Sequence, residues 1–406
     1  MTPESSVVQP LEFQGDSTPH LKKFDGCGVT RLVLTDFRNY PDLVLSCDPG
    51  PVALSGPNGA GKTNILEALS LLSPGRGLRS IKLSEALYDE ASRSVGEERQ
   101  ESWSVAAQIQ GLGGPVDLGV GFLGTGEREK RLIKIQGESV ASQSALSEYV
   151  NFLWLTPQMD GVFLDGSSAK RKFFDRIVYT FDAAHAGRVL RYEHAMRERL
   201  RLLKMNLGHE ESWFQALEHK MALEGVTIAG ARLRTLQALS QAEHWALGVF
   251  PQAGLSLEGL LEKALEDGQD PLLIEQNFQD QLKQSRFKDR ESGRTTLGPQ
   301  RTDLKVTYVD KGRPAEHCST GEQKALLLSI IMAACRVLVH QGNVVPIVLL
   351  DDLVAYLDDG RRRTLFEEIL NLKLQVWMTS AEEDTFNALK GQIQHFRIVD
   401  GGLDVL

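Results

Sequence analysis

The sequence predicts an α/β fold whose core is assembled from both ends of the chain, with a helical lobe inserted between the two parts. Strand patterns and glycine-rich turns fill residues 27–165 and return over residues 296–406. Between them, residues 166–295 are rich in Leu, Ala, Arg, Glu and Gln at helical spacing, with few strand signals. Residues 1–26 mix Ser, Pro and Gln with scattered charges, which is typical of a disordered tail.

The most specific motif is a glycine-rich loop between a predicted strand, residues 51–55, and a predicted helix, residues 64–72. The loop consists of Gly56, Pro57, Asn58, Gly59, Ala60, Gly61, Lys62 and Thr63. Its glycines let backbone N–H groups turn toward an anion, and the helix start adds the positive end of its dipole. The pattern G-x-x-x-x-G-K-[ST] predicts ATP binding, with Lys62 on the β- and γ-phosphates and Thr63 as a ligand of Mg²⁺.

A second apolar run, residues 345–350, ends in the two carboxylates of Asp351 and Asp352. A buried parallel strand can deliver an acid to Mg²⁺ at its carboxyl end in this way. We expect Asp351 to hold the metal and Asp352 to act as a general base or to position water. The alternative is a core strand that ends in two acids by chance, and the phosphate-binding loop in the same chain makes this interpretation much weaker.

A third motif opens the apolar helix that begins near residue 320. Ser319 or Thr320 is a good N-cap, and Glu322 stands at capping-box spacing from Ser319. One interpretation is a well-capped buried helix. The other is a second phosphate-binding surface, made by Ser319, Gly321, Glu322 and the N–H groups of the helix start, which would close over the γ-phosphate held by another copy of the chain.

These motifs, in this order, resemble those of the ATP-binding-cassette class. The long helical insertion between the first and the third resembles the SMC-like group. At finer grain the chain resembles the RecF family of bacterial recombination mediators. The segments that carry this resemblance are 34–40, with the sequence Phe37-Arg38-Asn39-Tyr40, 63–68, 156–160, 170–175, 297–304 and the two later motifs.

The resemblance implies two further site residues. Arg38 is expected to contact the nucleotide, and Gln158 to coordinate Mg²⁺ or the attacking water. Gln158 stands where the family more often has Glu, and Gln300 replaces the usual His of the segment 297–304. The tail 1–26 is longer than the family needs.

The resemblance also implies the activity. It implies binding of ATP, Mg²⁺ and single-stranded, gapped and double-stranded DNA, with an ATP-dependent homodimer and a weak DNA-stimulated ATPase. It implies RecR- and RecO-like mediator proteins and RecA recombinase as partners, in DNA replication, recombinational repair and the SOS response. Two alternatives stay open. A transporter ATPase subunit fits the motif spacing poorly, and a nuclease of the overcoming-lysogenisation type needs a nuclease domain for which no residues remain.

Composition and charge say less than the motifs about partners and location. The net charge of −9 argues by itself against a nucleic-acid partner, although basic residues cluster at both ends of the lobe, over 170–176 and 283–294. The four cysteines lack metal-binding spacing and read as reduced. The sequence shows neither an 18-residue apolar run nor the features of a signal peptide, so we expect a cytoplasmic, nucleoid-associated protein with no membrane contact.

Overall fold

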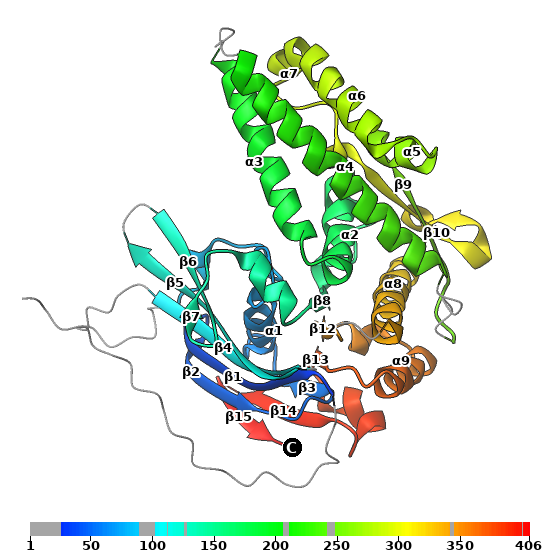
Figure 1. Ribbon diagram of the computed structural model, residues 1–406. Coiled ribbons are helices and arrows are strands. Elements are labelled where there is room, and N and C mark those ends of the chain that lie inside the picture. The colour runs from blue at the N-terminus through cyan, green and yellow to red at the C-terminus, as the bar shows by residue number, and fades with distance from the viewer. Residues whose placement is uncertain are drawn as a thin grey trace, which may run out of the picture.

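The central sheet of the protein is built from both ends of the chain, and a helical lobe rises from it (Figure 1). The computed structural model describes residues 26–88, 102–111, 113–125, 128–205, 211–241, 248–341, 345–399 and 401–406. All of the predicted tail except Gly26 lies outside these residues. The α/β class and the assembly of the core from both chain ends are confirmed.

The central sheet has the strand order β15-β14-β3-β13-β12-β8. Its strands are β3 (Val52–Ser55), β8 (Phe152–Leu155), β12 (Ile347–Leu350), β13 (Val376–Ser380), β14 (Gln394–Val399) and β15 (Gly402–Val405). All neighbours are parallel except β14 and β15. Every residue of β3, β8, β12 and β13 is buried, which explains why these strands are mainly apolar and do not alternate. Only the carboxyl ends of β3 and β13 carry polar residues, Ser55, Thr379 and Ser380.

A second, antiparallel sheet has the order β2-β1-β4-β5-β6-β7. Its strands are β1 (Gly28–Phe37), β2 (Tyr40–Ser46), β4 (Ser102–Gly111), β5 (Gly114–Thr125), β6 (Arg128–Ile135) and β7 (Glu138–Ser139). Helix α1 (Lys62–Leu71) shares one apolar cluster with this sheet and with one face of the central sheet. The other face of the central sheet packs against α2 (Ser167–Phe181), α8 (Thr320–His340) and α9 (Asp359–Asn371). The phosphate-binding loop therefore enters α1 between two buried layers.

A buried glutamine joins the two ends of the chain. The backbone N–H of Val29 donates to Gln375 Oε1 at 2.7 Å, and Gln375 Nε2 donates to the carbonyl of Val29 at 2.8 Å. The neighbouring Gly28 is required here, because a Cβ at this position would lie 2.7 Å from the Gln375 side chain. The amide of Gln375 thus completes the hydrogen bonds of β1 at its contact with the central sheet.

Helix α8 is long and apolar enough, by composition, to cross a membrane. The sequence analysis found no such run, because Lys324 and Arg336 interrupt the apolar residues. In the structure 78% of the apolar window is buried inside the protein, so α8 is a core helix.

The lobe consists of α3 (His185–Lys204), α4 (Glu211–Gln241), α5 (Leu260–Glu266), α6 (Pro271–Gln284) and α7 (Arg286–Ser292). Apolar residues of α3, α4, α5 and α6 form a cluster separate from the ATPase core, while the last turns of α4 pack against that core through Ala231 and Leu239. The segment predicted as helical also contains a strand, β9 (Ala253–Glu258). It pairs with β10 (Asp303–Tyr308), and β11 (Arg313–Pro314) completes a small third sheet.

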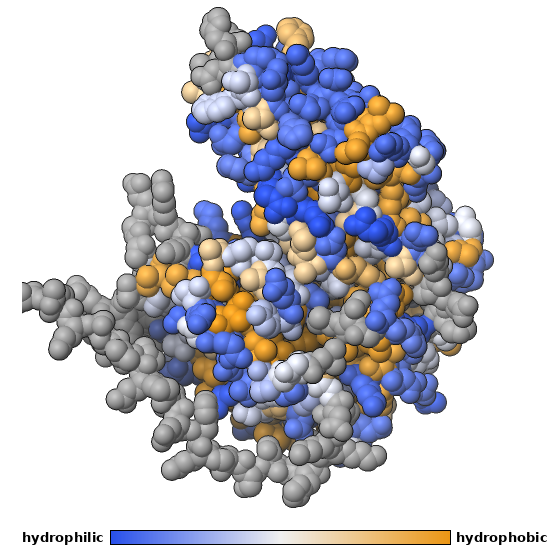
Figure 2. Space-filling model, in the orientation of Figure 1, coloured by the Kyte–Doolittle hydropathy of each residue, from blue (hydrophilic) through white to orange (hydrophobic). Residues whose placement is uncertain are grey.

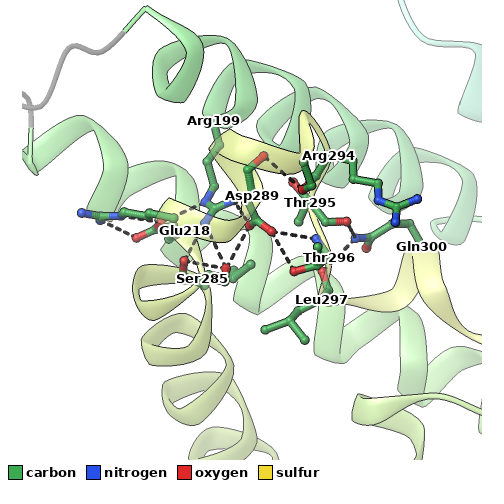
Figure 3. A network of polar contacts seen from close by, with 12 residues as sticks. Arg199, Glu218, Ser285, Asp289, Arg294, Thr295, Thr296, Leu297 and Gln300 are labelled. Carbon is green, nitrogen blue, oxygen red and sulfur yellow. Dashed lines mark hydrogen bonds and ion pairs between the residues drawn. The ribbon is translucent and has the colours of Figure 1, made fainter.

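The centre of the lobe holds fully buried charges (Figure 3). Arg199 donates to Glu218 at 2.9 Å and to Asp289 at 2.7 Å. Burial alone would raise the pKa of Asp289, but hydrogen bonds from Arg199, Thr296 and Ser285 outweigh it and hold this pKa below its usual range. The network fixes α3, α4 and α7 against one another, because each side chain in it comes from a different element.

Candidate functional site

The phosphate-binding loop has the backbone that its glycines permit. Gly56, Gly59 and Gly61 have backbone φ values of 144°, 84° and 110°, which residues other than glycine rarely adopt. A Cβ at Gly56 would lie 2.1 Å from the carbonyl oxygen of Ile398, and one at Gly61 would lie 2.4 Å from Asn39 Nδ2. The loop is therefore closely enclosed, and only glycine fits at these two positions.

Lys62 is 4% exposed and its amine points back into the loop. Its Nζ donates to the carbonyl oxygens of Gly56 at 2.7 Å and Pro57 at 2.9 Å. Burial lowers the pKa of Lys62, while the nearby carboxylates of Asp352 and Asp351 act to raise it. Among the described residues, the amine is thus a buried cation whose hydrogen-bond acceptors are both neutral. Phosphate oxygens arriving in the loop would be better partners than these carbonyls.

The loop and β12 meet at Thr63 and Asp351. Thr63 Oγ1 donates to Asp351 Oδ1 at 2.8 Å, and Thr379 Oγ1 donates to the same oxygen at 2.9 Å. Asp351 is 5% exposed, and burial raises its pKa although both hydroxyl groups oppose the shift. Residues 288 positions apart in the sequence are therefore in contact, as the sequence predicted for a metal-binding pair.

The oxygen donors of Thr63 and Asp351 fit Mg²⁺, which prefers hydroxyl, carboxylate and water ligands. Within the described ranges, no three His, Cys, Asp or Glu side chains form a metal site. A nucleotide-linked Mg²⁺ needs only one or two protein ligands, because phosphates and waters supply the rest. Thr63 and Asp351 would hold such an ion, which would offset the negative charge of the phosphates.

Asp352 has an unusual backbone, with a φ of 49°. This conformation is uncommon outside glycine, and Asp is among the residues that tolerate it best. Its N–H donates to Thr379 Oγ1 at 2.7 Å. Thr379, the last residue but one of β13, contacts both acids and so orients the pair that the sequence singled out. These contacts follow from the position of β13 next to β12 in the sheet.

Arg38 lies beside the loop but is bound to α1. Its Nε and Nη2 donate to the two carboxylate oxygens of Glu67 at 2.9 and 2.8 Å, and its Nη1 donates to the carbonyl of Glu85 at 2.7 Å. Arg79 also donates to Glu67 at 2.9 Å. In this state Arg38 helps to hold α1. Its contact with a nucleotide stays a prediction.

Asn39 is a residue of the site that the sequence analysis missed. Its Nδ2 donates to the carbonyl of Ala60 in the loop at 3.1 Å, and its Oδ1 accepts from Asn64 Nδ2 at 2.7 Å. Arg79 in turn donates to Asn64 at 2.9 Å. Asn39 thus holds the phosphate-binding loop from outside. Its place next to Arg38 in the segment 34–40 was the available signal.

Gln158 lies in a 3₁₀ turn, Pro157–Met159, that follows β8. It is exposed. Strand β8 runs parallel to β12, and the N–H of Asp351 donates to the carbonyl of Leu155 at 3.0 Å. The turn with Gln158 therefore begins at the same edge of the sheet as Asp351. Whether Gln158 reaches the metal stays a prediction.

The signature helix α8 begins with the predicted capping box. Ser319 N–H donates to Glu322 Oε2 at 2.7 Å, and Glu322 N–H donates to Ser319 Oγ at 3.4 Å. Lys311 also contacts Glu322, and together with Ser319 it lowers the pKa of this carboxyl to about 2. Ser319, Thr320 and Gly321 are exposed, so the helix start is capped and also accessible.

Gln300 holds the turn of the segment 297–304 (Figure 3). Its Nε2 donates to the carbonyl of Leu297 at 2.7 Å, and its Oε1 accepts from the hydroxyl of Tyr192 at 2.6 Å. Gly298 has a φ of 119°, and a Cβ there would lie 2.3 Å from the Tyr192 hydroxyl. Gln300 therefore uses both ends of its amide, which a neutral His could imitate with its two ring nitrogens.

Comparisons with known proteins agree with this geometry. The RecF/RecN/SMC N-terminal domain family matches residues 28–401. The DNA replication and repair protein RecF of Rhizobium rhizogenes is 40% identical over 377 residues, which are 92% of this chain and 98% of the relative. The protein of the same name from Brucella suis is 41% identical over 383 residues, with 93% and 96% covered.

Solved structures show the same fold. The structure of an ATP-bound recombination mediator protein RecF of the RecFOR pathway has a TM-score of 0.78 at 22% identity, with 96% of this chain and 100% of the other covered. The Smc head domain of Pyrococcus furiosus has a TM-score of 0.53 at 17% identity, with 94% and 96% covered. With a matched family domain over most of its length and relatives at about 40% identity, the chain belongs to the RecF family.

Proposed function

We propose that this protein is an ATP-dependent DNA clamp that acts in DNA replication and recombinational repair. The observation that carries the proposal is the contact between Thr63 and Asp351 at 2.8 Å beside the buried amine of Lys62. A preformed pair of oxygen ligands and a cation without an anionic partner are what Mg²⁺ and the phosphates of ATP require. The RecF relatives, named for DNA replication and repair, support the cellular role.

Dimer formation follows from the exposure of the signature. Ser319, Thr320 and Gly321 are exposed at the start of α8, and the Ser319 hydroxyl donates to the Glu322 carboxylate at 2.9 Å. A second copy would bring its bound γ-phosphate to this exposed helix start as a further anion. Two chains facing each other in opposite directions satisfy both sites at once and form a two-fold-symmetric pair. ATP therefore stabilises the dimer, and hydrolysis releases it.

DNA is the proposed ligand of the paired molecules. The net charge of −9 is spread unevenly, and Lys172, Lys204, Lys288 and Arg301 are exposed cations on or next to the lobe. Figure 2 shows a mainly hydrophilic lobe and a hollow between the lobe and the ATPase core. Affinity for DNA depends on the cations that meet phosphates rather than on the total charge. The proposal also includes partners, a process and a location. The partners are RecR- and RecO-like mediators and RecA recombinase, the process is the SOS response, and the location is cytoplasmic and nucleoid-associated.

Sedimentation tests the dimer. The wild-type chain should be a monomer alone and a dimer with ATP and Mg²⁺, with tighter binding to gapped DNA in the dimer. Ser319→Arg should bind ATP as a monomer, because bulk and misplaced charge block the pairing. Ser142→Arg, at another exposed N-cap serine, is the matched control and should still pair. A wild-type chain that stays monomeric with saturating ATP and DNA would refute the clamp.

Hydrolysis is tested at Asp352. If this carboxylate positions the attacking water, Asp352→Asn should bind ATP normally and slow its hydrolysis by about 100-fold. The ATP-bound dimer should then accumulate, since hydrolysis no longer depletes it. Steady-state phosphate release and sedimentation measure both effects. A normal rate in Asp352→Asn would make Asp352 a structural acid that sets the turn after β12.

A further inference from the structure

Arg176 of α2 is a cation without an anionic partner. Its Cζ lies 4.2 Å from the centre of the Trp154 ring, and its Nη2 contacts Met159 Sδ at 3.5 Å. Its Nε is buried and makes no hydrogen bond. Among the described residues, no carboxylate lies within ion-pair distance of Arg176. Phe173 offers a second, more distant ring, 5.9 Å from Cζ. Among the described residues the guanidinium is therefore held by aromatic rings and a thioether.

The buried arginines of the lobe are built differently. Arg199 pairs with Glu218 and Asp289, and Arg232 pairs with Asp175 and Glu262. At Arg176, burial lowers the pKa of the guanidinium to about 9. Contact with the Trp154 ring offsets only part of the cost of burying this cation. A methionine or leucine could cover Trp154 without this cost, so packing alone does not account for a charge here.

The position of Arg176 supplies the reason for the charge. Trp154 belongs to β8, the edge strand of the central sheet, and β8 leads directly into the turn with Gln158 and Met159. Arg176 therefore contacts this turn from α2. Lys324 of the signature helix pairs with Asp160, directly after the turn, at 3.0 Å. The turn that carries Gln158 is therefore held by both α2 and the signature helix.

We propose that Arg176 is a positioning residue for Gln158. Through its contacts with Met159 and Trp154 it fixes the turn that would present Gln158 to a Mg²⁺ ion held by Thr63 and Asp351. Because the guanidinium touches Met159, next to Gln158, a shift of Gln158 toward bound Mg²⁺ and ATP would move the turn against Arg176. Helix α2 thereby responds to the bound nucleotide. This inference rests on the proposed function, because it assumes that Mg²⁺ and ATP bind at this site.

The first test is a Mg²⁺ titration with a fluorescent ATP analogue. Arg176→Met keeps an unbranched side chain over Trp154 and removes the charge. It should need about tenfold more Mg²⁺ for half-maximal binding, while its affinity in EDTA stays within twofold of wild type. Arg176→Lys should recover part of the loss. Arg197→Met, at an exposed arginine of α3 outside the proposed sites, is the control and should behave as wild type.

The outcomes separate the two proposals. A wild-type chain that binds no nucleotide would remove the proposed function, and this inference with it. Nucleotide binding by wild type, together with an unchanged Mg²⁺ requirement in Arg176→Met, would overturn the positioning role alone. Equal losses with Mg²⁺ and in EDTA would also overturn it, because a merely structural residue would not discriminate between the two conditions.

A spectroscopic test covers the case in which Arg176→Met does not fold. The emission of Trp154 is obtained as the difference between wild type and Trp154→Phe. It should change when Mg²⁺ and ATP are added to wild type, since the stacked cation is displaced relative to the ring. In Arg176→Lys the planar stack is lost and the change should fall at least threefold. An equal change in wild type and Arg176→Lys would refute the coupling.

Discussion

The lobe and the nucleotide site both bury charged side chains, but the partners of these side chains differ. In the lobe, Arg199 is fully buried and bonded to the carboxylates of Glu218 and Asp289. In the described part of the nucleotide site, the amine of Lys62 donates to two backbone carbonyls, and the carboxylate of Asp351 accepts from two hydroxyl groups. Paired charges inside the chain serve structure, whereas charges with neutral and replaceable partners are available to a ligand.

The pKa directions express the same difference. Burial lowers the pKa of Lys62 and raises that of Asp351, so both charged forms are disfavoured in the folded chain. In the lobe the pKa of Asp289 is lowered and that of Arg232 is raised, because ion pairs and hydrogen bonds outweigh burial. The site therefore costs stability until a ligand arrives, and the lobe does not.

The largest effect should come from breaking a paired charge. Arg199→Met leaves Glu218 and Asp289 buried without their cation, and it should lower the free energy of unfolding by about 3–5 kcal/mol. Thermal and urea unfolding measure this loss. Arg197→Met, at an exposed arginine with a loose pair to Glu193 at 3.8 Å, is the control and should change stability by less than about 0.5 kcal/mol. Equal losses in the two variants would contradict the comparison.

The matching change in the site should spare stability. Lys62→Ala removes the amine that meets two phosphates, and we expect ATP affinity to fall by at least about 100-fold, or about 2.7 kcal/mol. Lys62→Arg should bind ATP but misplace the γ-phosphate, because a guanidinium does not replace a compact ammonium. Nucleotide titration and thermal unfolding together check this. Unchanged ATP affinity in Lys62→Ala would remove the assignment of the loop.

The sequence alone predicted the ATPase core better than the contacts around it. The phosphate-binding loop, the strand before Asp351 and the capped helix after Ser319 each follow local rules of glycine spacing, apolar runs and capping, so one segment suffices to predict each. The contact of Thr63 with Asp351 could be expected because parallel strands end at a common edge of the sheet.

The remaining features depend on residues far apart in the sequence. Strand β9 is only six residues long and is defined by its pairing with β10, so a window inside the helical segment could not reveal it. Thr379 touches both acids because β13 lies next to β12. Arg38 and Glu67 pair across 29 positions, and nothing in the segment 34–40 predicts which acid Arg38 meets.

Asp351→Asn should separate stability from function within one residue. An Asp whose folded-state pKa is raised stabilises the fold below its unfolded pKa, and this contribution is lost as the pH rises through the folded pKa. At neutral pH a permanently neutral Asn, which still accepts from Thr63 and Thr379, should therefore raise Tm by a few degrees. Half-maximal ATP binding should need about tenfold more Mg²⁺, since one metal ligand is lost. A lower Tm in the metal-free variant would show that the carboxylate stabilises the fold.

The smallest effect concerns the boundary of the two regions, where Gln300 binds the turn before β10 to Tyr192 of the lobe. In Gln300→His a neutral ring can accept from Tyr192 and donate to the carbonyl of Leu297, so stability at pH 7.5 should equal that of wild type. Protonation removes the acceptor, so the folded state disfavours the charged ring. The pKa of this histidine in the folded state then falls below its usual value of about 6.5. The free energy of unfolding therefore decreases as the pH drops below about 6.5. At pH 5.5 the variant should lose about 1 kcal/mol, seen as a Tm lower by about 2–4 °C, while wild type has no matching step at this position.

Gln300→Leu is the control, because it loses both hydrogen bonds at either pH and should show the same deficit in both buffers. A deficit of Gln300→His that does not depend on pH would mean that the amide of Gln300 matters for its shape and not for its pair of hydrogen bonds.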